Sequence, residues 1–190
     1  MRRRGAGARL QFTMLVLVTA ATRHEATREI AQVIAAGLAR RGIDARALAL
    51  EQVADVESYD AVVLGSAVYV GRWLRPALSF AGAHAATLAA RPVWLFSSGP
   101  LGPPGARVPA TDPADVEELL ALTGARGHRV FGGRLERSRL GAGERAVVRV
   151  VHAPYGDERD WEDVDAFAGE IAAALMPAAA GAAADSTPLR

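Results

Sequence analysis

Short runs of apolar residues alternate along this chain with segments in which apolar residues recur every three or four positions. The apolar runs cover residues 14–18, 43–50, 61–64, 93–96 and 128–131. Runs of this length, rich in Val, Leu and Ile, are typical of strands that are buried on both faces, as in a parallel sheet. We therefore expect five buried strands.

Helical spacing fills most of the intervals between these runs. Ile30, Ile34 and Leu38 lie on one face of a first predicted helix, and a second is expected from residue 74 to about 90. A third helix is predicted to start with Asp112 as N-cap and Pro113 at the first helical position, and to run to about residue 122. Residues 134–160 have no clear pattern, although 144–151 would fit a short helix. The last helix is expected over about 161–176, ending at Pro177.

Buried strands that are separated by helices indicate an α/β protein. We predict a single three-layer, doubly wound domain with a five-stranded parallel sheet over residues 13–176. Residues 1–12 are expected to be a disordered basic extension, and 177–190 a flexible tail. The three arginines at 2–4 followed by apolar residues also resemble a signal peptide, but this run leads directly into a helix and fits a core strand better.

Composition narrows the classes of function. The 22 basic and 21 acidic residues give a net charge of +1, which provides no argument for nucleic acid or an anionic membrane as partner. Cysteine is absent, which excludes disulfides and thiolate metal sites, and the four histidines lack metal-ligand spacing. The apolar run near the N-terminus is short for a transmembrane helix. We expect a cytoplasmic protein with no transmembrane segment and no metal.

The segment Thr-Arg-His-Glu-Ala-Thr at residues 22–27 joins the first predicted strand to the first predicted helix. Free N–H groups at the start of the helix, its dipole and the Thr hydroxyls would converge there on an anion, for which phosphate is the natural candidate. The same residues also fit a capping box, in which Thr22 and Glu25 satisfy the helix end without any ligand. The loop by itself leaves both interpretations open.

Two further loops follow the third and fourth predicted strands. Residues 65–73 contain Tyr69 between two glycines, followed by a second aromatic residue, Trp73, and residues 97–102 are mostly small. In an open parallel sheet, ligands bind beyond the carboxyl ends of the strands. A phosphate at the first loop and a planar heterocycle between the other two would form a mononucleotide site, with Tyr69 and Trp73 at the edge of the heterocycle rather than in the core.

These loops, together with Asp160-Trp161 and the helix after it, resemble the flavodoxin-like superfamily over about residues 14–176. Within it, the pattern is similar to the branch that contains the menaquinone-dependent protoporphyrinogen oxidases. The resemblance implies a parallel sheet of order 2-1-3-4-5 that binds FMN, and it implies a set of cofactor-binding residues. These are Thr22, Arg23, His24, Ala26 and Thr27 at the phosphate, Ser66, Ala67, Val68, Tyr69 and Gly71 on one side of the ring, and Ser97, Ser98 and Gly99 on the other.

The chain departs from the family's pattern at Glu25, where the phosphate loop usually has glycine. A carboxylate near a phosphate is repulsive, and glycine's backbone freedom is lost. We expect an FMN-dependent oxidoreductase with a small-molecule or quinone acceptor, and the sequence marks no catalytic acid or base. An electron carrier without its own substrate and a flavin-free regulatory module on the same fold are the alternatives. The acidic surface typical of such carriers is missing.

Overall fold

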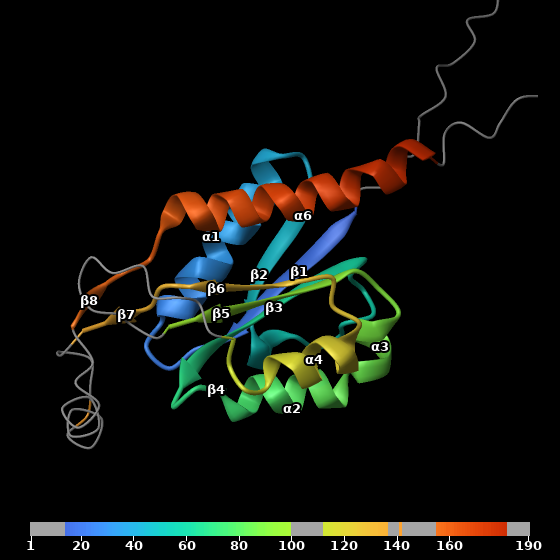
Figure 1. The fold of residues 1–190 in the computed structure, drawn as a ribbon. Helices are drawn as coiled ribbons and strands as arrows, with labels where there is room; N and C mark the ends of the chain where they lie inside the picture. Colours follow the sequence, from blue (N-terminus) through green and yellow to red (C-terminus); the bar gives the residue numbers. More distant parts are fainter. Residues whose placement is uncertain (1–13, 100–111, 137–140, 142–154, 182–190) are drawn as a thin grey trace, which may run out of the picture.

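Five parallel strands form the centre of the protein in a computed structural model that describes residues 14–99, 112–136, 141 and 155–181 (Figure 1). The strands are β1 (Leu15–Ala21), β2 (Asp44–Ala49), β3 (Ala61–Tyr69), β5 (Val93–Ser98) and β6 (His128–Phe131). Their order in the sheet is β2-β1-β3-β5-β6, and every neighbouring pair is parallel. This is the expected 2-1-3-4-5 order, so the predicted fold class is confirmed.

Helices cover both faces of the sheet (Figure 1). On one face lie α1 (Ala26–Arg40) and α6 (Trp161–Gly181), and on the other lie α2 (Arg75–Ala83), α3 (Ala85–Ala89) and α4 (Val116–Thr123). Successive side chains of a strand point to opposite faces. Val63 therefore packs beneath α1 and α6, whereas its neighbour Val62 packs against α2 and α3. Both cores need apolar residues, which explains why the central strands β1, β3 and β5 contain continuous apolar runs.

Smaller elements accompany the main sheet. Strand β4 (Arg72–Trp73) pairs antiparallel with the end of β3, whereas β7 (Arg134–Leu135) and β8 (Gly156–Asp157) pair antiparallel with each other and form a separate two-stranded sheet. A single turn of 3-10 helix, η1 (Leu50–Gln52), follows β2. The short helix considered for residues 144–151, and most of the two terminal extensions, lie outside the described residues.

The third strand is longer than predicted. The apolar run was expected to stop at Gly65, but β3 continues through it to Tyr69. Gly65 is not at a turn: an added Cβ would overlap the ring of Phe96 on the adjacent strand. Glycine at this position makes room for an aromatic side chain in the core, which is one of the structural roles of glycine inside a strand.

Three helix boundaries also differ from the prediction. The helix expected over 74–90 is interrupted at His84, where the backbone leaves helical geometry and the imidazole packs against Phe80. Helix α4 begins at Val116 with Asp115 as its N-cap, and the carboxylate of Asp112 bonds to a histidine instead of capping the helix. Helix α6 continues past Pro177 to Gly181, although proline leaves one helical carbonyl without its usual donor.

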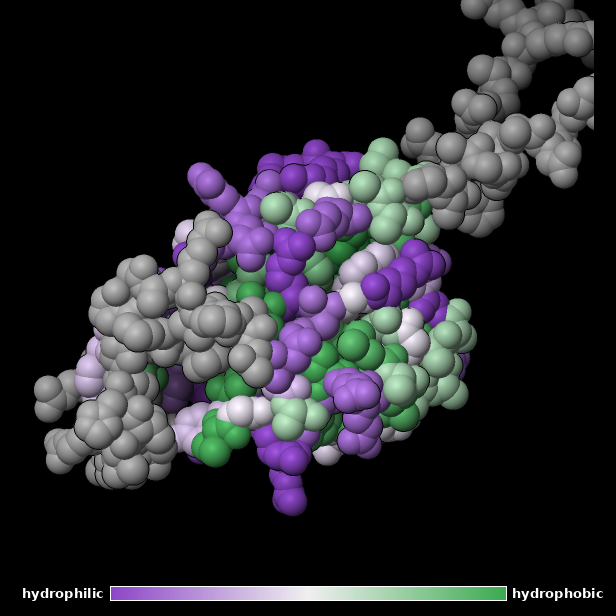
Figure 2. Space-filling model, viewed as in Figure 1, coloured by the Kyte–Doolittle hydropathy of each residue, from purple (hydrophilic) through white to green (hydrophobic). Residues whose placement is uncertain are grey.

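The outer surface of the two helical layers has a mixed hydropathy. Hydrophilic and hydrophobic residues are interspersed over both layers, and hydrophobic ones gather at the C-terminal end of α6 (Figure 2), where Met176 is exposed. Within the described ranges, no helix combines the length and the apolar content that crossing a bilayer requires.

Candidate functional site

The carboxyl ends of three adjacent strands place three loops at one edge of the sheet. In the strand register, Ala21 of β1 pairs with Ser66 of β3, and Ser66 pairs with Ser97 of β5. The chain beyond each of these positions therefore leaves the sheet at the same level. The segments 22–27, 66–71 and 97–99, which the sequence singled out, are brought together at this edge.

The first loop presents the N-terminus of α1. The helix begins at Ala26, and Thr27 in its first turn is buried. The first N–H groups of a helix have no partner within it, and the side chain of the N-cap residue, Glu25, makes no hydrogen bond to them. The hydroxyl of Thr22 is buried and has no hydrogen-bond partner among the described residues. The capping box between Thr22 and Glu25, one of the two interpretations of this loop, is therefore not formed.

Glu25 occupies the N-cap position in a left-handed conformation, with φ of 67°. Left-handed backbone is strained for a residue with a Cβ, and glycine adopts it without cost. The carboxylate of Glu25 forms an ion pair with Arg28 at 2.8 Å on the exposed side of the helix. The departure from glycine thus leaves the backbone path intact, and Arg28 partly neutralises the added charge.

The second loop is a tight hairpin that connects β3 to β4. Tyr69 pairs with Arg72, and the two residues between them, Val70 and Gly71, have φ of 53° and 72°. Positive φ at both central positions is the requirement of a type I′ turn. Tyr69 at the start of the turn is 37% exposed, and the guanidinium of Arg23 from the first loop lies over its ring, 5.0 Å from the centroid.

Asp115 holds this hairpin against the start of α4. Its buried carboxylate accepts hydrogen bonds from the Arg72 guanidinium at 2.6 Å and from the Trp73 backbone N–H at 2.9 Å. The Ala114 N–H adds a bond to the Gly71 carbonyl. Trp73 itself is only 3% exposed, so the expectation that it borders the ring is wrong; it is a core residue.

The hydroxyls of Ser66 and Ser97 are used inside the protein. Ser66 Oγ donates to the Ala67 carbonyl and accepts from the Leu74 N–H. Ser97 Oγ accepts from Trp73 Nε1 at 2.7 Å and lies 2.8 Å from His128 Nε2. Since the Asp112 carboxylate can only accept, the neutral imidazole of His128 donates from Nδ1 and accepts from the Ser97 hydroxyl at Nε2. The side chains of these two serines therefore stabilise the edge of the sheet, and only their backbone groups are available to a ligand.

His128 extends the bonds at Ser97 into a chain, because its Nδ1 lies 2.9 Å from Asp112 Oδ1. Burial lowers the pKa of His128 against the opposing effect of Asp112, so the imidazole favours its neutral form. The order Ser–His–Asp resembles a hydrolase triad, but Ser97 is fully buried, which closes it to substrate. The sequence did not predict this series of hydrogen bonds, because the spacing of the three residues does not indicate that they lie close together.

The third loop contributes backbone. Ser98 is buried at the end of β5, and Gly99 turns with φ of 95° while its N–H donates to the Phe131 carbonyl. A Cβ added to Gly133 would approach the Gly99 Cα to 3.2 Å, so the two glycines allow close approach of the segments after β5 and β6. Ala67 and Val68 are half-buried and face the edge from β3, His24 is half-buried in the first loop, and Ala26 is buried at the helix start.

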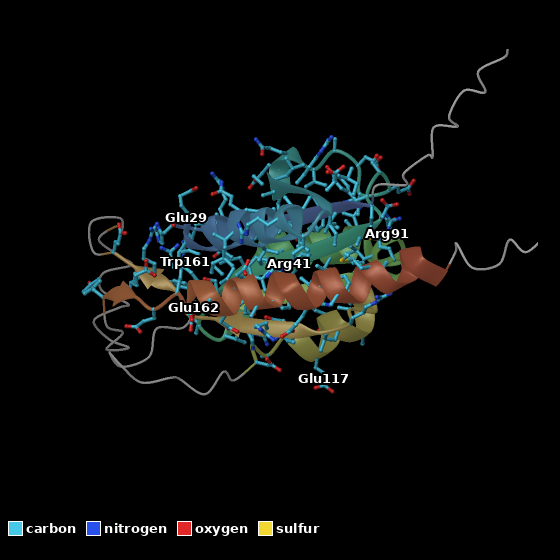
Figure 3. The ribbon with its side chains drawn as sticks, turned by 90° about the horizontal axis from the view of Figure 1, so that it is seen from above. Glu29, Arg41, Arg91, Glu117, Trp161 and Glu162 are labelled. Carbon is cyan, nitrogen blue, oxygen red and sulfur yellow. The ribbon has the colours of Figure 1, made fainter. Side chains whose placement is uncertain are left out.

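A second cluster next to the first loop was not predicted. Glu29, in the first turns of α1, accepts from Arg134 at 2.8 Å and from Arg159 at 2.6 Å, and Arg159 also pairs with Asp157. Burial opposes ionisation of Glu29, but the bonds and charges of the two arginines outweigh it and lower its pKa. Arg159 also lies over the Trp161 ring. Glu29 and Trp161 lie at the same end of the molecule, so this cluster fastens the β7–β8 ribbon to α1 (Figure 3).

The residues at this edge fit a phosphorylated cofactor. An unpartnered buried hydroxyl and uncapped helical N–H groups are the donors that a phosphate takes, and an exposed aromatic ring and a glycine turn flank the remaining space. Among the described residues, no group of three acidic or imidazole side chains is arranged to hold a metal ion. The chemistry of the donors thus favours an anionic, planar ligand.

Comparison with known proteins agrees with the fold. Over 173 residues, the chain is 29% identical to the protoporphyrinogen IX dehydrogenase [quinone] of Escherichia coli K12, covering 84% of this chain and 95% of that protein. It superposes on a flavodoxin from the domain Archaea with a TM-score of 0.57 at 13% identity, covering 86% of this chain and 99% of that one. Oxidised flavodoxin 1 from Bacillus cereus gives 0.57 at 17% identity, with coverage of 85% and 99%.

The branch resemblance drawn from the three loops is therefore confirmed at the level of sequence similarity. The family model of the flavodoxin domain matches residues 17–162, which include most of β1 and all three segments of the candidate site. The chain belongs to the flavodoxin domain family.

Proposed function

We propose that this protein binds FMN at the carboxyl edge of its sheet and acts as an FMN-dependent oxidoreductase. The observation that carries the proposal is the Thr22 hydroxyl, which is buried beside the N-terminus of α1 without a partner among the described residues. A buried hydroxyl without a hydrogen bond is costly. A phosphate accepting from this hydroxyl and from the first N–H groups of the helix would remove that cost.

The isoalloxazine ring is assigned to the space between the β3–β4 hairpin and Gly99. Tyr69 offers the face of its ring, and the hairpin is braced from below by Asp115. FMN supplies the redox chemistry when bound, and the protein supplies binding and orientation. The proposal assigns no catalytic carboxylate or nucleophile to the site, and Glu25, the carboxylate of the first loop, pairs with Arg28.

A quinone is the proposed acceptor, since the Escherichia coli relative is named a quinone-dependent protoporphyrinogen IX dehydrogenase and is matched along nearly its whole length. A location in the cytoplasm, with a domain that spans residues 13–176, belongs to the same proposal. The alternative is an electron carrier, as in the flavodoxins that share the fold. Stopped-flow reduction by NAD(P)H, with and without a quinone, separates the two, because only the oxidoreductase turns over repeatedly with the quinone.

The test uses the two buried hydroxyls of β1 and its loop as a matched pair. Thr22 and Thr19 both have an unpartnered Oγ1 in the described part of the chain, but Thr19 lies inside the strand. Thr22→Val is expected to weaken FMN binding about tenfold or more, by loss of a hydrogen bond to a charged group of about 1.5–3 kcal/mol. Thr19→Val is expected to leave FMN affinity unchanged, and riboflavin affinity should change in neither variant.

FMN titration followed by absorbance and flavin fluorescence measures both affinities. Tyr69→Ala is expected to weaken quenching and affinity for FMN and riboflavin alike, because it removes the stacking face. Failure of the wild-type protein to bind either flavin would refute the proposed function. Equal losses of FMN affinity in the two threonine variants would place the phosphate elsewhere.

A further inference from the structure

Arg23 and Tyr69 connect the two halves of the candidate site. Arg23 belongs to the loop after β1 and Tyr69 to the end of β3, two strands that are adjacent in the sheet. The guanidinium lies over the tyrosine ring, 5.0 Å from its centroid. A residue assigned to the phosphate thus covers a ring assigned to the isoalloxazine.

The contact of Arg23 with the Tyr69 ring and its proposed contact with a phosphate differ in strength. A guanidinium over an exposed aromatic ring is a weak attraction, and both Arg23 and Tyr69 are exposed. A guanidinium facing a phosphate makes charge-assisted, bidentate hydrogen bonds, which are among the strongest in proteins. The neighbouring Thr22 and the start of α1 place the proposed phosphate next to Arg23 in the chain. The stronger partner would draw the side chain away from the ring.

We propose that Arg23 is a specificity-determining residue that makes access to Tyr69 depend on the ligand's phosphate. Without phosphate, the guanidinium covers the ring face that is turned toward the first loop. A ligand with a phosphate monoester binds the guanidinium and uncovers that face for its own planar ring, whereas a ligand without phosphate has to displace the guanidinium unaided. The site therefore selects FMN over riboflavin by more than the phosphate contacts alone. This inference rests on the proposed FMN site.

Arg28 provides the matched control. It has the same side chain and lies on the first turn of α1, but its guanidinium pairs with Glu25 at 2.8 Å. Arg23→Gln and Arg28→Gln remove the same charge from two positions near the start of α1. Only Arg23→Gln also removes the cation that lies over the Tyr69 ring.

Flavin titrations of the wild type and the two variants give the first readout. In Arg23→Gln, FMN affinity is expected to fall about tenfold or more through loss of a charge-assisted bond. Riboflavin affinity is expected to rise about two- to fivefold, the equivalent of a cation–π contact at an exposed site. In Arg28→Gln, FMN affinity should fall less and riboflavin affinity should stay unchanged. Unchanged or weaker riboflavin binding in Arg23→Gln would overturn the inference, since the guanidinium would then not compete with the ring.

A second readout works without any flavin. The chain has three tyrosines, so protein labelled with ¹³C in the tyrosine rings gives few signals, and Tyr69→Phe assigns the one from Tyr69. Millimolar inorganic phosphate is expected to shift that signal in the wild type toward its position in Arg23→Gln, and to leave it unchanged in Arg23→Gln itself. No shift in the wild type would overturn the inference. A shift in a protein that binds no flavin would refute the FMN site and leave the coupling of Arg23 to Tyr69 standing.

Discussion

Arg159 donates to the carboxylate of Glu29 at 2.6 Å across 130 positions of the chain. Its side chain is only 3% exposed, and Arg134 reaches the same carboxylate with 14% exposure. Glu29 lies one turn after the first loop, so the fastening of the β7–β8 ribbon and the start of α1 depend on one another. Glu29, a residue of a surface helix, thereby stabilises the segment that carries the first loop of the candidate site.

Glu29→Gln is expected to lower the free energy of unfolding by about 1.5–3 kcal/mol, because two largely buried guanidinium groups each lose one of their charged acceptors while keeping Asp157 and Glu136. Glu25→Gln serves as the control: it breaks an exposed pair with Arg28 and should change stability by less than about 1 kcal/mol. Urea denaturation at pH 7 measures both. Equal effects in the two variants would show that the buried cluster is not specially stabilising.

Stability should also depend on pH through His128. Burial puts its pKa in the folded protein below that of the unfolded chain, which is about 6.5. The unfolded chain therefore binds the proton more readily, so the contribution of His128 is complete above pH 6.5 and is lost as the pH falls through its folded pKa. Urea midpoints at pH 7.5, 6.5 and 5.5 should decrease in the wild type. His128→Gln should show a flatter profile over this range, and an equally steep one would refute the assignment.

Gly65→Ala is expected to destabilise the fold by about 1–3 kcal/mol or more, since the added methyl group would overlap the Phe96 ring. Gly82→Ala is the control, because nothing lies within 4 Å of its added Cβ and it lies inside α2. Alanine should raise helix stability there by roughly 0.5–1 kcal/mol. Thermal unfolding of the two variants should thus shift in opposite directions, and a neutral Gly65→Ala would mean that Phe96 repacks freely.

Glu25→Gly removes a left-handed residue with a side chain, which is strained by about 1–2 kcal/mol. Glycine also costs roughly 0.5–1 kcal/mol in chain entropy, so stability should rise slightly or stay constant. FMN affinity should increase about two- to fivefold, because the substitution removes a carboxylate that repels the phosphate. The increase is small because Arg28 already pairs with that carboxylate. Riboflavin affinity should not change.

Glu25→Ala separates the two effects of that substitution. It removes the charge and keeps a Cβ at positive φ. FMN affinity should therefore rise as in Glu25→Gly, without the gain from relieved strain. If alanine leaves FMN binding at the wild-type level while glycine strengthens it, backbone freedom rather than charge limits the site.

Local patterns in the sequence were sufficient for the architecture. Strands buried on both faces must be apolar at every position, so runs such as 61–64 and 93–96 reveal themselves without knowledge of their neighbours. The order of the strands came from resemblance to a family, and the register then placed Ala21, Ser66 and Ser97 side by side, as expected. The positions of the loops follow from the strands.

The tertiary structure decided what each side chain at those loops does. The spacing of Thr22 and Glu25 matches a capping box, but the backbone at Glu25 turns left-handed and leaves the Thr22 hydroxyl without a partner among the described residues. Trp73 was expected at the ring edge, yet its indole finds Ser97 in the core.

Long-range pairs were beyond the reach of the sequence for a physical reason. The spacing of apolar residues shows which face of a helix or strand is buried, because each buried position favours an apolar residue whatever element lies opposite it. A hydrogen bond such as Ser97–His128 or Glu29–Arg159 depends on which elements the fold brings together, and no local pattern encodes that choice. The sequence by itself determined the layers, the strands and the edge of the sheet where a ligand would bind. Only the tertiary structure decided which side chains at that edge bond to other parts of the protein and which remain available to a ligand.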